Sequence, residues 1–330
     1  MSILKTVGLL SIGIFSLGLT ACQKSEDAQK TSENTQGNPV KVLSIGFQKS
    51  ALNLLVVRDQ KLLEQQFPNA KVEWKEFPAG PQMLEALAVG AVDFGYVGNM
   101  PPIFAQAANK DLNYVGYEVY PEESLALVIK NGSAITHIND LKGKRIAVQK
   151  GSSAHELLSK ILQKANLTWQ DIQPIWLPPA DARAAFDKGS VDAWVIWDPY
   201  LAAAELEGSA KPIIHGKAFP KTYAFYIGNP HFIKAHPDAP EKIIKSLNEA
   251  DQWIVNNINV ATQTYANNTG LKESVATRSI ERRLKPSPIH PLTPDVIQAQ
   301  QNIADLFKNL NLIPNRVEIK DMVWSPNSTH

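Results

Sequence analysis

The sequence contains one cysteine, Cys22, and no marked excess of charge of either sign. A single thiol cannot form a disulfide bond within the chain, so a fold stabilised by such bonds is excluded. The 33 basic and 32 acidic residues give a formal net charge of +1, and no basic stripe is present. We therefore expect neither nucleic-acid binding nor attachment to a membrane through a polybasic surface.

The sequence also lacks the motifs of common hydrolases and nucleotide-binding proteins. It has no G-x-S-x-G elbow, no H-E-x-x-H metal motif and no Walker sequence. Among the seven histidines, His231 and His236 flank a proline turn without a carboxylate pattern, which is typical of solvated loop residues. We expect no enzyme, and therefore no catalytic residue, no metal site and no cofactor.

The first apolar run is too short to be a membrane span. It extends from Val7 to Leu19, whereas a membrane-spanning helix needs about 20 residues, so residues 1–21 are predicted to be a signal peptide. The sequence L-T-A-C that ends it resembles the bacterial lipobox, which implies lipidation of Cys22. Residues 22–39 are polar and lack large apolar side chains, so they are predicted to be a flexible tether.

The stretch Arg145–Ala165 predicts a strand, a turn of small residues and a helix. An apolar run at 146–148 ends near Gly151, and apolar residues then recur at helical spacing. Ser153 is expected to be the N-cap, and Glu156 completes a capping box. The outward N–H groups at such a helix start suit an anion, although an ordinary capped helix has the same pattern.

A similar unit occurs earlier in the chain. Residues 42–57 repeat the apolar run and the polar turn, with Gln48 and Lys49 in the place of Gln149 and Lys150. Downstream of both units follow an extended run ending in proline, a helix, a Val-Asp pair and an apolar strand. This duplication predicts an α/β fold with two lobes, each built as β-α-β-α-β.

Two predicted strands, at 124–130 and 223–228, belong to neither repeat. If the chain passes from one lobe to the other at these strands, lobe 1 comprises residues 40–128 and 224–330, and lobe 2 comprises residues 129–223. The two lobes are then joined by a two-segment hinge. The roughly 290 residues after the tether suit two lobes. Apolar spacing predicts extra C-terminal helices, which are expected at 239–255, 261–266, 275–284 and 293–312.

Five sequence blocks resemble the aliphatic sulfonate-binding proteins of ABC importers. They are F-P-A-G-P-Q-M-L-E-A-L, G-N-M-P-P-I-F-A-Q-A-A, Q-K-G-S-S-A-H-E-L-L, L-P-P-A-D-A-R-A-A-F and V-D-A-W-V-I-W-D-P-Y. The resemblance extends over residues 42–324 and implies a type II periplasmic-binding-protein-like fold, whose lobes close on the ligand at the hinge. It also implies capture of an aliphatic sulfonate and its delivery to an inner-membrane permease for sulfur acquisition.

The resemblance places the ligand at polar turns that face the cleft. A sulfonate stays ionised at physiological pH, so serine hydroxyls and helix-end N–H groups suit it, although Glu156 would compete for these N–H groups. Trp197 would cover the alkyl part or belong to the core, and Asp198 would contact the ligand or only cap the next turn. Asn99 stands where similar sequences often carry Asp, which bears on the charge of the pocket. The predicted ligand-binding residues are Gln48, Ser50, Asn99, Met100, Gly151, Ser152, Ser153, Trp197 and Asp198.

Other functions remain open. The chain could bind another small anion or a heterocycle, such as taurine, nitrate or a pyrimidine precursor. An enzyme similar to the thiamine-pyrimidine synthases is disfavoured by the signal peptide, and a lipoprotein adaptor that binds protein is a further alternative. We expect a monomer in the periplasm or cell envelope that contacts the membrane through a lipid on Cys22.

Overall fold

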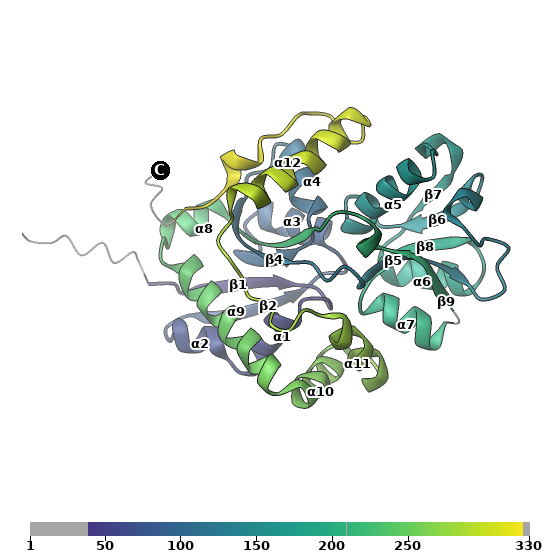
Figure 1. Ribbon diagram of the computed structural model, residues 1–330. Coiled ribbons are helices and arrows are strands. Elements are labelled where there is room, and N and C mark those ends of the chain that lie inside the picture. Colours follow the sequence, from purple (N-terminus) through teal and green to yellow (C-terminus); the bar gives the residue numbers. More distant parts are fainter. Residues whose placement is uncertain (1–38, 209, 326–330) are drawn as a thin grey trace, which may run out of the picture. The chain divides into compact units, whose positions relative to one another are not determined.

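The computed structural model describes residues 39–208 and 210–325. Cys22, the predicted signal peptide and all but the last residue of the predicted tether lie outside this range. The described residues form two five-stranded sheets with helices on either side of each sheet (Figure 1). No helix in the described part of the chain combines the length and the apolar character that crossing a membrane requires. The predicted α/β class is confirmed.

The first sheet has the strand order β2-β1-β3-β10-β4. Strand β1 pairs in parallel with β2 and β3, whereas β10 is antiparallel to β3 and β4. All residues of β1 after the first are buried, as expected for a strand with helices on both faces. The strands are β1 (Val42–Phe47), β2 (Lys71–Glu76), β3 (Phe94–Val97), β4 (Asn113–Val119) and β10 (Tyr223–Gly228).

The second sheet repeats this arrangement with the order β7-β6-β8-β5-β9. Strand β6 is parallel to β7 and β8, and β5 is antiparallel to β8 and β9. The predicted duplication is therefore present in the strand order and direction of the two lobes. The strands are β5 (Leu125–Lys130), β6 (Arg145–Val148), β7 (Gln173–Trp176), β8 (Ala193–Trp197) and β9 (Ala210–His215).

The chain passes between the sheets twice, at 120–124 and at 216–222. The boundary predicted at residue 128 falls inside β5 and is corrected, because β5 pairs over its length with strands of the second sheet. The N–H of Tyr120 donates to the carbonyl of Thr222 at 3.0 Å. The two crossing segments thus lie side by side, and their action as a hinge stays a prediction.

Within the described part of the two lobes, seven helices connect the strands. One of them directly follows another helix, and each of the others begins shortly after the carboxyl end of a strand, so these helix starts gather at the same edges of the sheets. In lobe 1 they are α1 (Leu52–Asp59), α2 (Leu62–Gln66), α3 (Gly80–Ala88) and α4 (Met100–Ala107). In lobe 2 they are α5 (Ser153–Lys164), α6 (Pro179–Asp187) and α7 (Tyr200–Glu207), with short 3₁₀ turns at Ile138–Leu141, Trp169–Asp171 and Gly216–Ala218.

The C-terminal part is helical, as predicted. The four expected helices are present, and α12 begins directly after Thr293 with proline in its first turn. A further short helix, α8, starts at Pro230, where a proline turn with loop histidines was predicted. The elements are α8 (Pro230–Ala235), α9 (Ala239–Asn256), α10 (Ile258–Thr269), α11 (Glu273–Arg282), α12 (Pro294–Asn309) and a 3₁₀ turn at Ile319–Met322.

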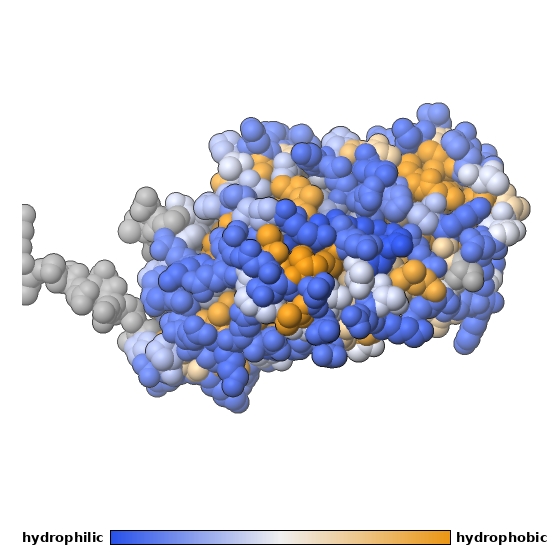
Figure 2. Space-filling model, turned by 60° about the horizontal axis from the view of Figure 1, so that its bottom comes forward, coloured by the Kyte–Doolittle hydropathy of each residue, from blue (hydrophilic) through white to orange (hydrophobic). Residues whose placement is uncertain are grey.

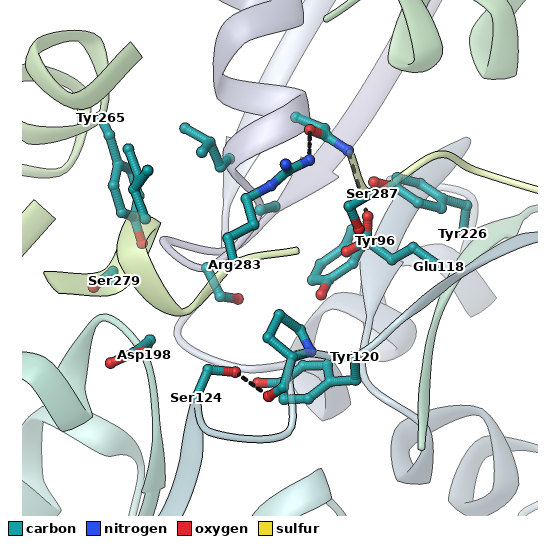
Figure 3. Close-up of a pocket in the computed structure, with 16 residues that line it drawn as sticks. Tyr96, Glu118, Tyr120, Ser124, Asp198, Tyr226, Tyr265, Ser279, Arg283 and Ser287 are labelled. Carbon is teal, nitrogen blue, oxygen red and sulfur yellow. Dashed lines mark hydrogen bonds between the residues drawn. The ribbon is translucent and has the colours of Figure 1, made fainter. Parts of the chain in front are cut away.

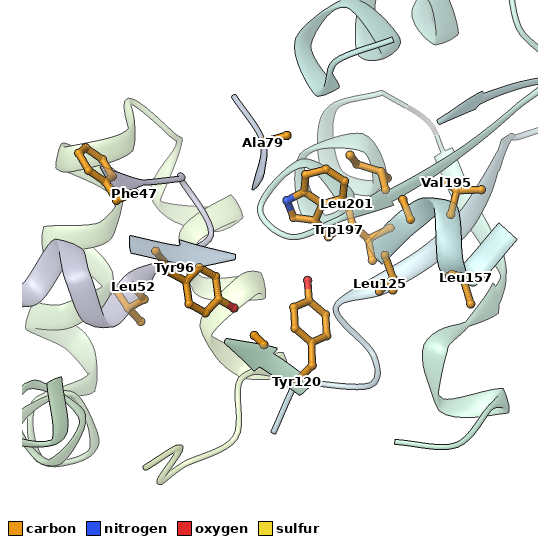
Figure 4. Packing of buried hydrophobic residues seen from close by; sticks show 14 of the residues in the cluster. Phe47, Leu52, Ala79, Tyr96, Tyr120, Leu125, Leu157, Val195, Trp197 and Leu201 are labelled. Carbon is orange, nitrogen blue, oxygen red and sulfur yellow. The ribbon is translucent and has the colours of Figure 1, made fainter. Parts of the chain in front are cut away.

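One hydrophobic cluster extends through both lobes. It includes Phe47 and Leu52 of lobe 1 and Leu157 and Val195 of lobe 2 (Figure 4). Large apolar side chains that remain exposed are few and far apart in the sequence, and on the face in Figure 2 hydrophilic surface separates the hydrophobic patches. Scattered apolar residues of this kind are usual on soluble proteins. The monomeric state stays a prediction.

Candidate functional site

A cavity of about 320 Å³, including its part open to solvent, lies where turns of both lobes meet. The turns follow β1, β3, β6 and β8, so the cavity is at the carboxyl ends of strands in each sheet, where open α/β sheets place their ligands. We call it the serine cavity. Its lining residues from lobe 1 and the first crossing are Gln48, Ser50, Gly80, Tyr96, Gly98, Pro101 and Tyr120, and those from lobe 2 are Ser152, Ser153 and Trp197.

Five of the nine predicted residues line the serine cavity: Gln48, Ser50, Ser152, Ser153 and Trp197. Gln48 is held in place because its Nε2 donates to the carbonyl of Tyr96 at 2.9 Å. Trp197 lines the cavity and also belongs to the hydrophobic cluster, so its core role is confirmed, and its contact with the alkyl part of a ligand stays a prediction.

The start of α5 differs from the prediction. Its N-cap is Ser152 rather than Ser153, and no capping box forms. Ser152 Oγ donates to the carbonyl of Gln149 at 2.7 Å, while Glu156 pairs with Lys160 one turn further on and so does not compete for the helix start. Among the described residues, no acceptor faces the N–H groups of Ser153 and Ala154. Two donors at the positive end of the helix are thus left for a ligand.

Asn99 and Met100 do not line the serine cavity. The chain turns into α4 directly after β3, with Asn99 already in the helical region, so both side chains are buried. The Asn99 carbonyl accepts from Gln300 Nε2 of α12, and its side-chain amide has no partner among the described residues. Contact of these two residues with a ligand is not favoured by this geometry.

Gly151 also lies outside the serine cavity, in a contact between the lobes. It has a φ of 73°, which glycine adopts without strain, and a Cβ atom there would meet the Phe104 ring of α4 at 3.4 Å. Gly98 similarly approaches lobe 2, because a Cβ atom on it would overlap Ser153 Oγ. These two glycines allow the lobes to approach closely beside the cavity.

Aromatic rings around His155 join the lobes on one side of the cavity. The His155 ring lies 5.7 Å from Phe104 and 5.1 Å from Phe307 of lobe 1, between ring centroids. It lies 4.9 Å from Trp169 and 5.0 Å from Trp176 of lobe 2. Burial lowers the pKa of the His155 imidazole to about 3, so the ring is neutral at physiological pH. We call these five residues the His155 cluster, which the sequence did not predict.

Asp198 lies beside the serine cavity and joins β8 to the C-terminal helices. Its Oδ1 accepts from the Ala202 N–H at 2.9 Å, which is the capping role considered from the sequence. It also pairs with Arg282 of α11 at 3.2 Å, and Arg282 pairs with Glu205. Burial raises the pKa of the Asp198 carboxyl to about 7. Asp198 therefore connects the two lobes as well as facing a cavity.

A second cavity, of about 580 Å³ including its open part, adjoins the serine cavity and shares Ser50, Tyr96 and Tyr120 with it. Its lining includes Glu118 of β4 and Arg283, which the sequence did not single out (Figure 3). Burial raises the pKa of the Glu118 carboxyl to about 7. The one signal in the sequence was a charged residue inside the otherwise uncharged strand N-Y-V-G-Y-E-V. We call this second cavity the Glu118 cavity.

Metal ligands do not gather in the described residues, where no group of three or more His, Cys, Asp or Glu side chains is placed to hold an ion. The polar groups of the two cavities are hydroxyls, amides, carboxylates, guanidinium groups and helix-end N–H groups. Such groups bind and orient a polar organic ligand.

Comparison with known proteins gives matches over both lobes. Residues 70–260 match the family model described as "NMT1/THI5 like". The chain is 38% identical over 323 residues to the "Putative aliphatic sulfonates-binding protein" of Escherichia coli (strain K12), covering 98% of this chain and 96% of the relative.

Two solved structures agree with this match. The alkanesulfonate-binding protein SsuA from Xanthomonas axonopodis pv. citri bound to MOPS has a TM-score of 0.84 and 42% identity, covering 87% of this chain and 99% of its own. The periplasmic aliphatic sulphonate binding protein SsuA from Escherichia coli has a TM-score of 0.79 and 40% identity, covering 86% of this chain and 97% of its own. The predicted two-lobed binding-protein fold is confirmed.

Proposed function

Because this chain belongs to the family of aliphatic sulfonates-binding proteins, we propose that it is the substrate-binding component of an ABC importer. It captures an aliphatic sulfonate between its lobes and delivers it to a membrane permease for sulfur acquisition. The observation that carries the proposal is the serine cavity, to which both lobes contribute polar groups at the carboxyl ends of their strands.

The chemistry of the serine cavity suits a sulfonate. The group stays anionic at physiological pH, so it needs fixed hydrogen-bond donors and no titratable partner. The Ser153 hydroxyl and the free N–H groups at the start of α5 supply such donors, and the helix dipole favours the negative charge. Trp197 offers an apolar surface to the alkyl part. MOPS, which is bound to the Xanthomonas relative, carries a propanesulfonate group.

Calorimetric titration of a ligand panel tests this function. We expect alkanesulfonates to bind at least about tenfold more tightly than sulfate or nitrate, since only the sulfonates fill the apolar part of the cavity. Tighter binding of nitrate or of a pyrimidine precursor would replace the proposal with one of the alternatives. The enzyme alternative is not retained, because the relatives that define the family are binding proteins.

Gly98→Ala is expected to weaken sulfonate binding by about tenfold, the effect of losing one hydrogen bond to a charged group. The added methyl group overlaps Ser153 Oγ, so the hydroxyl must leave its position or the lobes must separate. Calorimetry with a thermal melt checks that binding and not folding has changed. In a Ser153→Ala background the overlapping atom is gone, and Gly98→Ala should then have little further effect. A full additional loss in the double variant would contradict this explanation.

We also propose that the protein works in the periplasm, as the Escherichia coli relative does, and that a lipid on Cys22 anchors it there. In a bacterial host fed a labelled fatty acid, the wild-type protein should take up label and sediment with membranes. Cys22→Ser should remain an unlabelled precursor, because the thiol is the site of lipidation. If the wild-type protein takes up no label, the proposed lipid anchor on Cys22 is wrong. The monomeric state and the permease partner stay predictions.

A further inference from the structure

His155 forms a hydrogen bond with the turn that precedes the free donors of α5. The N–H of Gly151 donates to His155 Nδ1 at 3.2 Å. Ser153, the first residue of α5, follows Gly151 by only two positions and lines the serine cavity. A movement of Gly151 would therefore be passed on to the donors that face this cavity.

Gly151 depends on this hydrogen bond for its position. It has a φ of 73°, and glycine has no side chain that would restrict it to this region. Ser152 closes the turn through its N–H and its hydroxyl, which both donate to the Gln149 carbonyl. Among the described residues, only His155 accepts from the Gly151 N–H. The middle of the turn is thus tied to α5 through the imidazole.

The His155 ring is suited to act as a fixed acceptor. A backbone N–H can only donate, so Nδ1 accepts and the proton of the neutral ring is on Nε2. Burial lowers the pKa of the imidazole to about 3, so the Nδ1 lone pair stays available at physiological pH. The residue is 1% exposed, and Nε2 has no hydrogen-bond partner among the described residues. The orientation of the ring is therefore set by the aromatic side chains of the His155 cluster.

Phe104 of lobe 1 contacts both partners of this hydrogen bond. Its ring centroid lies 5.7 Å from that of His155, and the ring lies 3.4 Å from the place that a Cβ atom of Gly151 would take. Trp169 and Trp176 pack against the imidazole from lobe 2. Both lobes therefore enclose the hydrogen bond, and their separation would remove Phe104 from both of its partners.

We propose that His155 is a positioning residue of the sulfonate site. It holds Gly151, and with it the donors of Ser153 and Ala154, in the arrangement that binds the anion, and it does so when Phe104 packs against it. The inference rests on the proposed function, because it assumes that the anion binds at the start of α5. His155 does not line the serine cavity, so its effect on the ligand is exerted through Gly151.

Two variants of similar shape test the role of the Nδ1 acceptor. His155→Asn and His155→Leu both lose the aromatic ring, but only Asn has an oxygen, Oδ1, that can accept from the Gly151 N–H in the place of Nδ1. Ethanesulfonate is titrated calorimetrically into the full-length proteins at a temperature well below the thermal transitions of both variants. We expect His155→Leu to bind it about tenfold more weakly than His155→Asn, because the turn then contains an N–H without an acceptor.

Thermal melts of the ligand-free variants separate positioning from folding. Leu favours a helix more than Asn does, whereas Asn keeps the hydrogen bond to Gly151, so these contributions to stability oppose each other. A residue that only packs the core would change the melting temperature but not the affinity of the fully folded protein. Equal affinities of the Asn and Leu variants, or wild-type affinity in His155→Leu, would therefore overturn the proposal.

Ser159→Ala is the matched control on the same helix. Ser159 is also buried, and its hydroxyl donates to the His155 carbonyl at 3.0 Å. The change removes a hydrogen bond of α5 without altering the turn, so the affinity should stay within about twofold of wild type. A loss as large as that in His155→Leu would show that any change in α5 weakens binding, and it would overturn the specific role of Nδ1.

Nitrogen-15 NMR of histidine-labelled protein provides a second readout. The His155 signals are those that disappear in His155→Asn, and we expect them to place the ring proton on Nε2. A proton on Nδ1 would exclude the hydrogen bond from Gly151 and overturn the proposal. If the wild-type protein has the Nε2 proton but binds no sulfonate, the proposed function is wrong, and this inference is rejected with it.

Discussion

Ser152→Asp is expected to weaken sulfonate binding by about a thousandfold and to leave the fold intact. Ser152 lines the serine cavity at the start of α5. A carboxylate there faces the sulfonate at about 4 Å, which costs roughly 4 kcal/mol at an effective dielectric constant near 20. Folding should suffer little, because the loss of the hydrogen bond to the Gln149 carbonyl is offset at the N-cap position, where Asp is among the most favourable residues. Calorimetric titration and a thermal melt of the ligand-free variant measure the two effects.

Ser152→Asn is the matched control for this change. Asn has nearly the size of Asp and caps helices equally well, but it has no charge. It should therefore reproduce any steric loss of affinity without the electrostatic part. If the Asp and Asn variants bind a sulfonate equally well, the anion does not lie against this turn. The placement of the sulfonate at the start of α5 would then be wrong.

Glu118→Gln is expected to raise the free energy of unfolding of the ligand-free protein by about 3 kcal/mol at pH 8. Burial raises the pKa of this carboxyl from 4.5 to about 7, so the folded protein holds the proton more tightly than the unfolded chain does. The stability that this gives is complete below pH 4.5 and is lost as the pH rises through 7. The Gln side chain has a similar shape but no charge, so the folded variant avoids the free-energy cost of a buried carboxylate at pH 8.

Urea unfolding of both proteins across pH 4 to 8 measures this effect. The difference in unfolding free energy should be small at pH 4, where Glu118 is protonated in both states, and should grow towards pH 8. Glu123→Gln, which alters an exposed and paired carboxylate, should show no such growth. A difference between Glu118→Gln and wild type that does not change with pH would contradict the raised pKa of the buried Glu118 carboxyl.

Most of the fold could be predicted because its signals are local. The apolar runs of β1 and β6, the small-residue turns after them and the amphipathic helices occur in one order twice. The place of β5 could not be predicted in this way. It pairs with β9, about 85 residues later in the sequence. The apolar pattern of a strand indicates which residues are buried but not which other strand it pairs with.

The candidate site was predicted where it consists of turns after parallel strands, as at Ser50 and Ser152. It was missed where distant segments meet, since Glu118 and Arg283 come from unrelated parts of the chain. Asn99 illustrates a different limit. The sequence around it resembles the family, but the backbone enters α4 at once, and the buried Asn99 side chain does not line the serine cavity. The direction of a side chain depends on where a helix begins, and sequence patterns locate helix ends only to within a few residues.

The His155 cluster bears on how long a ligand stays bound. For the lobes to part, Phe104 and Phe307 must leave the imidazole, and all three rings must be hydrated in the act of separation. Protonation does not ease this step near neutral pH, because the pKa of His155 is held at about 3 by burial. The energy needed opposes dissociation, so it lengthens the lifetime of the complex. If release of the ligand requires the lobes to part, we expect its residence time to depend in part on rings that do not line its cavity.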